Sequence, residues 1–222
     1  MAFPDTRWTL VRAARSADIR RRALDELLTL YWPPAYAYAR RRGLDPEDAE
    51  EVVQELFASL LGPDVLARAD PSRGRLRSWL IGGLEHVIAH RREARTAKKR
   101  GGGAVAVSLD TETMEAWLAS DAASPEEAFT RAWADGVLRR ALARLEAETE
   151  PARYALLARI FGAGDVPAYR DLAAEAGMSV PQLKSFVFRS RGRLRTLALE
   201  EIRETVATPE EAERELAELL GG

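Results

Sequence analysis

The sequence predicts an all-α protein built from two helical domains that are joined by an acidic linker. Helix-forming Ala, Leu, Arg and Glu dominate the 222 residues, and runs of β-branched residues are missing. The run Gly101–Gly103 is the clearest break in this pattern, and no basic residue follows it before Ser124. We therefore expect a first domain at 1–100, a linker at 101–125, a second domain at 126–200 and an acidic extension at 201–222.

The formal net charge of −2 hides a segmental pattern. Counting Lys and Arg against Asp and Glu gives +5 for residues 1–100, −6 for 101–130, +4 for 131–200 and −5 for 201–222. Two separate basic blocks indicate a polyanionic partner. Solvated surface helices of mixed charge would give the same totals, so the charge alone leaves both interpretations open.

The composition excludes several classes of protein. Cys is absent, so neither a disulfide framework nor a thiolate metal site is possible. Residues 1–10 lack an apolar segment of signal-peptide length, and no run approaches the length that spans a bilayer. We expect a soluble, cytoplasmic protein with no membrane partner.

Three predicted helix starts share one local sequence, in which a capping residue precedes a proline and acidic residues. The capping oxygen can accept a hydrogen bond from an N–H of the first turn, and proline fits the first helical position. The acids oppose the positive end of the helix dipole. The three pairs of capping residue and proline are Asp45-Pro46, Ser124-Pro125 and Thr208-Pro209.

Residues 45–61 predict an amphipathic helix with an acidic outer face. The apolar face combines Ala49, Val52, Val53, Leu56, Phe57 and Leu60. The opposite face carries Glu47, Glu50, Glu51, Gln54 and Glu55. An acidic helix face is usually only solvated, although it can also bind a partner.

Residues 73–100 predict a segment of the opposite charge. Nine basic residues outnumber Glu85 and Glu93, and an apolar stripe that includes Trp79 runs between them. A helix that is apolar on one side and strongly basic towards its end suits phosphate binding, which gains from counterion release. Binding to an anionic membrane surface is a weaker alternative.

His86 and His90 lie one helical turn apart, which is a spacing found in metal sites. Because only two ligands of the right type stand on one helix, we expect no metal and no cofactor here, and interpret both as polar residues on an exposed or DNA-facing side. A metal-dependent hydrolase is a further alternative, but it would need additional catalytic or ligand residues. No nucleophile and base, glycine-rich phosphate loop or third ligand supports it, so we expect no catalytic residue and no small-molecule substrate.

Residues 169–195 predict a helix-turn-helix. A short apolar helix precedes Gly177, which permits a sharp turn, and Ser179 can cap the second helix. No acid occurs from Gln182 to Leu199, so the second helix presents basic and hydrogen-bonding groups of a kind that suits the DNA major groove. An ordinary helical hairpin is the alternative, but a hairpin has no need of a basic, acid-free helix.

In this order and spacing, three segments resemble the extracytoplasmic-function (ECF) group of the sigma-70 family. Asp48–Phe57 is similar to the family's polymerase-docking helix, Arg73–Leu80 to the basic segment that follows it, and Gly177–Arg195 to its C-terminal helix-turn-helix. The resemblance covers roughly residues 6–200. It implies a non-enzymatic sigma factor that directs promoter-specific initiation of transcription.

The resemblance also implies partners and site residues. Core RNA polymerase would be bound, through the clamp helices of its largest subunit, by Glu51, Gln54 and Glu55. Double-stranded and melted promoter DNA would be contacted by an N-terminal set and a C-terminal set. The first is Arg73, Arg75, Arg77, His86, Arg91 and Arg92; the second is Gln182, Lys184, Ser185, Phe188, Arg189, Arg191 and Arg193. An anti-sigma factor is a further partner that the resemblance allows.

The chain departs from the family pattern at several positions. Glu85 and His86 stand where Arg and Asn are common, and Phe186 and Phe188 replace Arg and His. We expect the acid at Glu85 to weaken any phosphate contact there.

A helix-turn-helix regulator that binds DNA by itself is the main alternative function. Such a protein usually acts as a dimer on a two-fold site. It would explain residues 165–200 but would leave the helix at 45–61 without a role.

Overall fold

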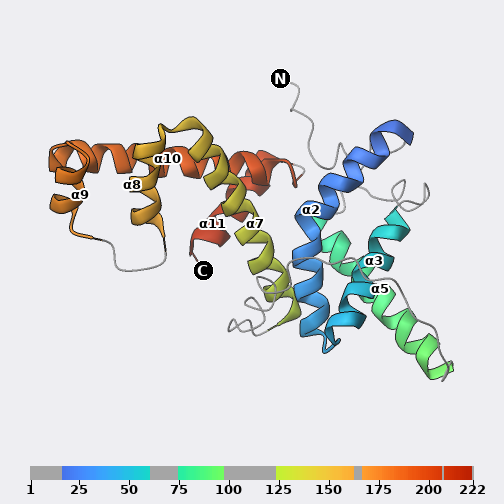
Figure 1. Cartoon of the computed structure of the whole chain (residues 1–222). Coiled ribbons are helices and arrows are strands. Elements are labelled where there is room, and N and C mark those ends of the chain that lie inside the picture. Colours follow the sequence, from blue (N-terminus) through green and yellow to red (C-terminus); the bar gives the residue numbers. More distant parts are fainter. Residues whose placement is uncertain (1–16, 61–74, 98–123, 163–166, 207, 222) are drawn as a thin grey trace. The chain divides into compact units, whose positions relative to one another are not determined.

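The computed structural model describes residues 17–60, 75–97, 124–162, 167–206 and 208–221. Within these residues all regular structure is helical, which confirms the predicted all-α class for this part of the chain (Figure 1). None of the helices described there is long and apolar enough to cross a membrane. The helices are α2 (Ala17–Arg41), α3 (Pro46–Leu60), α5 (Leu76–Ala97), α7 (Pro125–Glu148), α8 (Pro151–Phe161), α9 (Tyr169–Glu175), α10 (Val180–Arg203) and α11 (Pro209–Gly221).

The chain divides into two compact units. The N-terminal unit comprises residues 1–136 and 203–212, and the C-terminal unit comprises 137–202 and 213–222. The helices α2, α3 and α5 therefore belong to the first unit, whereas α8, α9 and nearly all of α10 belong to the second.

The three predicted helix starts are confirmed, and each carries its cap. The Asp48 N–H donates to Asp45 Oδ1 at 2.8 Å, the Glu127 N–H to Ser124 Oγ at 3.1 Å, and the Glu211 N–H to Thr208 Oγ1 at 3.2 Å. The Glu127 side chain also accepts from the Ser124 N–H at 3.1 Å, which completes a capping box. Such a cap typically stabilises a helix by about 1 kcal/mol.

In the N-terminal unit, α2, α3 and α5 pack against one another around a shared core. All six residues of the predicted apolar face of α3 are buried. Trp32 of α2 stacks on Phe57 of α3, with ring centroids 6.1 Å apart. Helix α2 ends at Arg41, and Gly43 follows with a φ of +84°; the backbone hydrogen bonds around it form a Schellman cap that turns the chain into α3.

Helices α3 and α5 approach closely at a pair of glycines in the middle of α5. A Cβ atom on Gly83 would lie 2.6 Å from Leu56 Cδ1, whereas a Cβ atom on Gly82 would meet nothing within 4 Å. Glycine weakens the interior of a helix by about 1 kcal/mol relative to alanine. The packing of α3 on α5 explains Gly83 but not Gly82.

In the C-terminal unit, α9 and α10 are joined by a tight turn. Gly177 has a φ of +63°, and the Met178 N–H donates to the Ala173 carbonyl at 2.9 Å, so the turn is again a Schellman cap. As predicted, Ser179 caps α10: the Gln182 N–H donates to Ser179 Oγ at 3.4 Å, and the Ser179 N–H to Gln182 Oε1 at 2.8 Å.

Helix α7 carries its apolar residues at a spacing of four. Phe129, Trp133, Val137, Ala141 and Leu145 are all buried. Because an α-helix has 3.6 residues per turn, sixteen residues rotate a side chain by about 160° beyond four full turns. Phe129 and Leu145 therefore lie on nearly opposite faces of α7. Correspondingly, residues up to 136 belong to the N-terminal unit and later ones to the C-terminal unit.

Candidate functional site

A pocket of about 640 Å³ opens between α3 and α5 in the N-terminal unit. Its volume is within the range of sites that hold small molecules or a single nucleotide base. The lining is Glu55, Leu56, Ser59 and Leu60 from α3, and Trp79, Gly82, Gly83, His86, Val87 and His90 from α5. Two of the predicted site residues, Glu55 and His86, thus share this pocket.

Gly82 lines the pocket without a side chain of its own. Gly82 is exposed, and the space beside it is empty of protein atoms. Because Gly82 lines the pocket, we expect a larger residue at this position to reduce the pocket volume. Gly82 thus weakens helix α5 and at the same time lines an open pocket.

The pocket offers an apolar surface with a few polar groups. Trp79 supplies an indole face, and His86 and His90 supply imidazoles that can donate or accept hydrogen bonds. Ser59 and Glu55 add a hydroxyl and a carboxylate. Among the residues that the structure describes, no group of three or more His, Asp or Glu could hold a metal ion.

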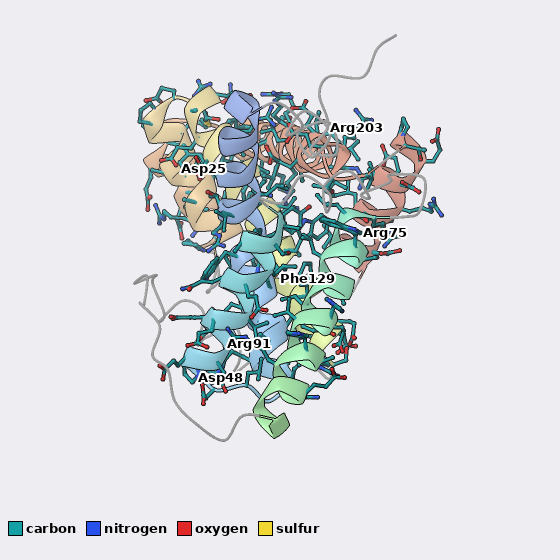
Figure 2. The ribbon with its side chains drawn as sticks, turned by 90° about the vertical axis from the view of Figure 1, so that its right-hand side faces the viewer. Asp25, Asp48, Arg75, Arg91, Phe129 and Arg203 are labelled. Atoms are coloured by element: carbon teal, nitrogen blue, oxygen red, sulfur yellow. The ribbon has the colours of Figure 1, made fainter. Side chains whose placement is uncertain are left out.

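Arg91 of α5, which is labelled in Figure 2, pairs with two of the predicted polymerase-binding acids on α3. Its Nη1 is 2.5 Å from Glu51 Oε2, and its Nε is 2.6 Å from Glu55 Oε2. Partial burial lowers the pKa of Arg91, but the hydrogen bonds to Glu55 and Glu51 outweigh it and hold the pKa above the ordinary value. Arg91 therefore joins α5 to α3 within the fold.

The other predicted N-terminal residues surround this ion pair. Gln54 is half-buried on α3 between the two acids. Arg92 is exposed, and its Nη2 donates to the Arg42 carbonyl at 3.4 Å. Arg75 precedes α5 and Arg77 lies in its first turn, both partly exposed. Arg73 lies outside the described residues.

Glu85, one of the departures from the family pattern, belongs to a polar cluster with α2. Its carboxylate accepts from Arg42 Nη2 at 3.0 Å and from the Tyr38 hydroxyl. Burial, and then the hydrogen bond to Glu85, raise the pKa of Tyr38 well above its usual value. The negative charge of Glu85 is thus balanced by Arg42.

In the C-terminal unit, the first half of α10 presents most of its predicted site residues to solvent. Leu183 and Val187 are buried. Phe188 is 78 % exposed, which is unusual for so large an apolar side chain. The other exposed members of the predicted set in this half are Gln182, Lys184, Ser185 and Arg189.

Further along α10, Arg193 is held by the fold and the exposed Arg191 lies near an aromatic ring. Arg193 forms two hydrogen bonds of 2.7 Å with the Glu148 carboxylate, and these lower the pKa of Glu148. The Arg191 guanidinium lies 5.9 Å from the centre of the Phe161 ring. The exposed first half of α10 is therefore the part most open to a partner.

The sequence did not single out Trp79, Ser59 or Gly82 as site residues and considered His90 only with His86 as a possible metal pair, although all four line the pocket. One signal was present, because Trp79, Gly82 or Gly83, His86 and His90 recur at intervals of three or four and so share a helix face. What the pattern could not show is that this face borders α3.

Comparison with known proteins identifies the domain that contains the pocket. Residues 27–97, about a third of the chain, match the family model described as sigma-70 region 2. No curated protein and no solved structure matches the chain. Because sigma factors bind polymerase and promoter DNA and are not enzymes, the match confirms the predicted non-enzymatic role in initiating transcription. The segment that holds α3, α5 and most of α2 thus matches sigma-70 region 2.

Proposed function

We propose that this protein is an ECF-group sigma factor that directs core RNA polymerase to specific promoters through two DNA-binding surfaces. The observation that carries the proposal is the pocket of the region 2 domain, which brings Trp79 and two histidines together beside the acidic helix α3. The surface on α10 would act as the second contact. Two weak contacts on one chain gain affinity when a polymerase holds both at the right distance.

The polymerase would dock on α3 through Gln54 and the neighbouring Glu51 and Glu55. The ion pairs with Arg91 fix both carboxylates on the helix surface, so little side-chain entropy would be lost on docking. Gln54 lies between them and can donate and accept hydrogen bonds.

Co-purification with core polymerase tests this docking surface. We expect Gln54→Lys to lose binding, whereas Ala143→Lys, at an exposed position of α7, should bind like the wild type. Gln54 is preferable to Glu55 for this purpose, because Glu55→Lys would also break an ion pair with Arg91. A wild-type protein that ignores polymerase but protects a two-fold DNA site would instead identify a free-standing dimeric regulator.

The pocket would hold an unpaired base of the melted promoter. Bases stack on aromatic side chains by about 1–3 kcal/mol each, and Trp79 offers such a surface. His86, His90 and Ser59 could hydrogen-bond the edge of that base. Arg75, Arg77 and Arg92 would contact phosphates, together with Arg73.

Filling the pocket tests this role. We expect Gly82→Leu to weaken the binding of single-stranded promoter DNA by the holoenzyme. Ala89→Leu, at an exposed position of α5 that does not line the pocket, is the matched control. Equal DNA binding by both variants would place the melted strand elsewhere.

The C-terminal unit would act as a region 4-like domain, with α9, the turn at Gly177 and α10 as its helix-turn-helix. Lys184, Ser185 and Arg189 would contact the upstream promoter element, and Gln182 could donate from its amide while its oxygen caps α10. Phe188 would make an apolar contact with a base. Substituting Lys184 or Arg189 by Ala should weaken binding to promoter DNA that carries this element.

A further inference from the structure

The first half of α7 adds a helix to the region 2 domain that the family match does not include. The match ends at residue 97, whereas Ser124–Gly136 belongs to the same compact unit as α2, α3 and α5. This segment, which we name the α7 cover, therefore lies on a face of the matched domain that would otherwise be open.

Two aromatic residues anchor the α7 cover. Phe129 and Trp133 are 0 % and 2 % exposed. Phe129, labelled in Figure 2, stacks on Tyr31 of α2 with ring centroids 6.5 Å apart. Ala128 and Ala132 form a further buried cluster with Ala37 of α2. Alanine buries little area, so the contact depends on two anchors, as is typical of interfaces in which a few residues supply most of the affinity.

The α7 cover also contacts one residue of the predicted DNA-binding set, Arg77. The guanidinium of Arg77 lies 5.2 Å from the centre of the Trp133 ring, within the range of a cation–π contact. A guanidinium held over an indole in this way is partly withdrawn from any phosphate.

The α7 cover also brings acidic residues to the matched domain. Its first turn carries Glu126 and Glu127, and Glu126 Oε1 lies 3.5 Å from the Tyr38 hydroxyl. Carboxylates repel a phosphate backbone that approaches the same face. The docked segment thus holds Arg77 through Trp133 and places the carboxylate of Glu126 near Tyr38.

We propose that the α7 cover is an autoinhibitory segment, which must leave α2 and α5 before Arg77 can contact promoter DNA. This inference rests on the proposed function, because it takes Arg77 as a DNA contact. An anchor of two aromatic residues suits the role, since a tethered segment stays docked at modest intrinsic affinity and can still be displaced.

A reversible covalent lock tests the proposal in the full-length protein. The chain has no cysteine, so a pair introduced at two facing alanines forms the only disulfide. The first variant combines Ala37→Cys with Ala132→Cys, and the second combines Ala37→Cys with Ala128→Cys. The Ala37→Cys variant alone, oxidised in the same way, is the control.

We expect the oxidised double variant to bind core polymerase but to form promoter complexes about tenfold less than its reduced form, and dithiothreitol to restore them. Equal promoter binding in both redox states would overturn the proposal, because the α7 cover would then be a permanent part of the domain. Failure of both pairs to form a disulfide would overturn it as well, since the docked contact would be absent. Loss of polymerase binding by the wild type would instead refute the proposed function.

Discussion

Replacing each of the two adjacent glycines of α5 by alanine should have different effects on stability. Both substitutions remove the cost of a glycine within a helix, which is about 1 kcal/mol. Gly82→Ala adds a methyl group where nothing lies within 4 Å, so this gain should be retained. Gly83→Ala places its methyl group 2.6 Å from Leu56 Cδ1, and Leu56 is itself only 2 % exposed.

The difference between the two variants measures the close packing of α3 on α5. Overpacking of a buried site costs about 1–3 kcal/mol. We expect a value near the lower end, about 1–2 kcal/mol, because the atom that must move is the end of a leucine side chain. The helix-propensity gain is common to both variants and cancels in the comparison. Gly83→Ala should therefore be less stable than Gly82→Ala by about this amount.

Urea unfolding of the two variants and the wild type, followed by circular dichroism, measures this difference from the midpoints at equal slope. In a thermal scan the same difference corresponds to about 2–8 °C in Tm. If Gly83→Ala proves as stable as Gly82→Ala, then α3 and α5 do not approach as closely as described. The same result would remove the reason for a glycine at position 83.

Three further predictions concern other contacts. Arg91→Ala should destabilise the protein by about 1 kcal/mol, because two partly exposed carboxylates lose their partner, and urea titration against Arg92→Ala would measure it. Folding raises the pKa of Tyr38, so the protonated Tyr38 hydroxyl stabilises the folded protein below pH about 10, and this stabilisation declines as the pH rises further. Between pH 9 and pH 11, the urea midpoint of the Tyr38→Phe variant should therefore fall less than that of the wild type. Phe188→Ala should leave stability unchanged but weaken holoenzyme binding to the upstream element about tenfold in a filter-binding assay.

Each of these has an outcome that contradicts it. An Arg92→Ala variant as unstable as Arg91→Ala would mean that the Arg91 ion pairs add nothing specific. Parallel loss of stability with pH in the wild type and the Tyr38→Phe variant would show that the hydroxyl does not titrate differently on unfolding. Leu138→Ala is the control for Phe188→Ala, because Leu138 is also a large exposed apolar residue, at 47 %. Equal DNA binding by these two variants would exclude a base contact by Phe188.

The helix starts could be predicted because they depend on residues close together in the sequence. Asp45, Ser124 and Thr208 each cap a helix whose first residue is the next proline, and the acids of the first turn follow at once. The apolar face of α3 could be predicted for the same reason, since helical periodicity alone places its residues on one side. The cap of α8 by Glu150 was missed, because glutamate is not among the usual capping residues.

Contacts between distant segments could not be predicted in this way. Arg91 lies 40 residues from Glu51, and helical periodicity showed only that one residue is basic and the other acidic. Their pairing depends on how α5 lies against α3, which in turn depends on Gly83 and Leu56. The pocket has the same origin: its residues were visible as helix faces, but the space between them is a property of the packing.

The spacing of four along α7 has a consequence for how this helix can change over evolution. Substitutions at its buried positions alter one contact at a time. A single inserted or deleted residue near Gly136 would rotate every later side chain by about 100° about the helix axis, and so would turn Ala141 and Leu145 away from their present direction. A four-residue insertion would rotate them by only about 40°. We therefore expect relatives of this chain to vary in the composition of α7 but to conserve its length, or to change that length in steps close to a whole turn.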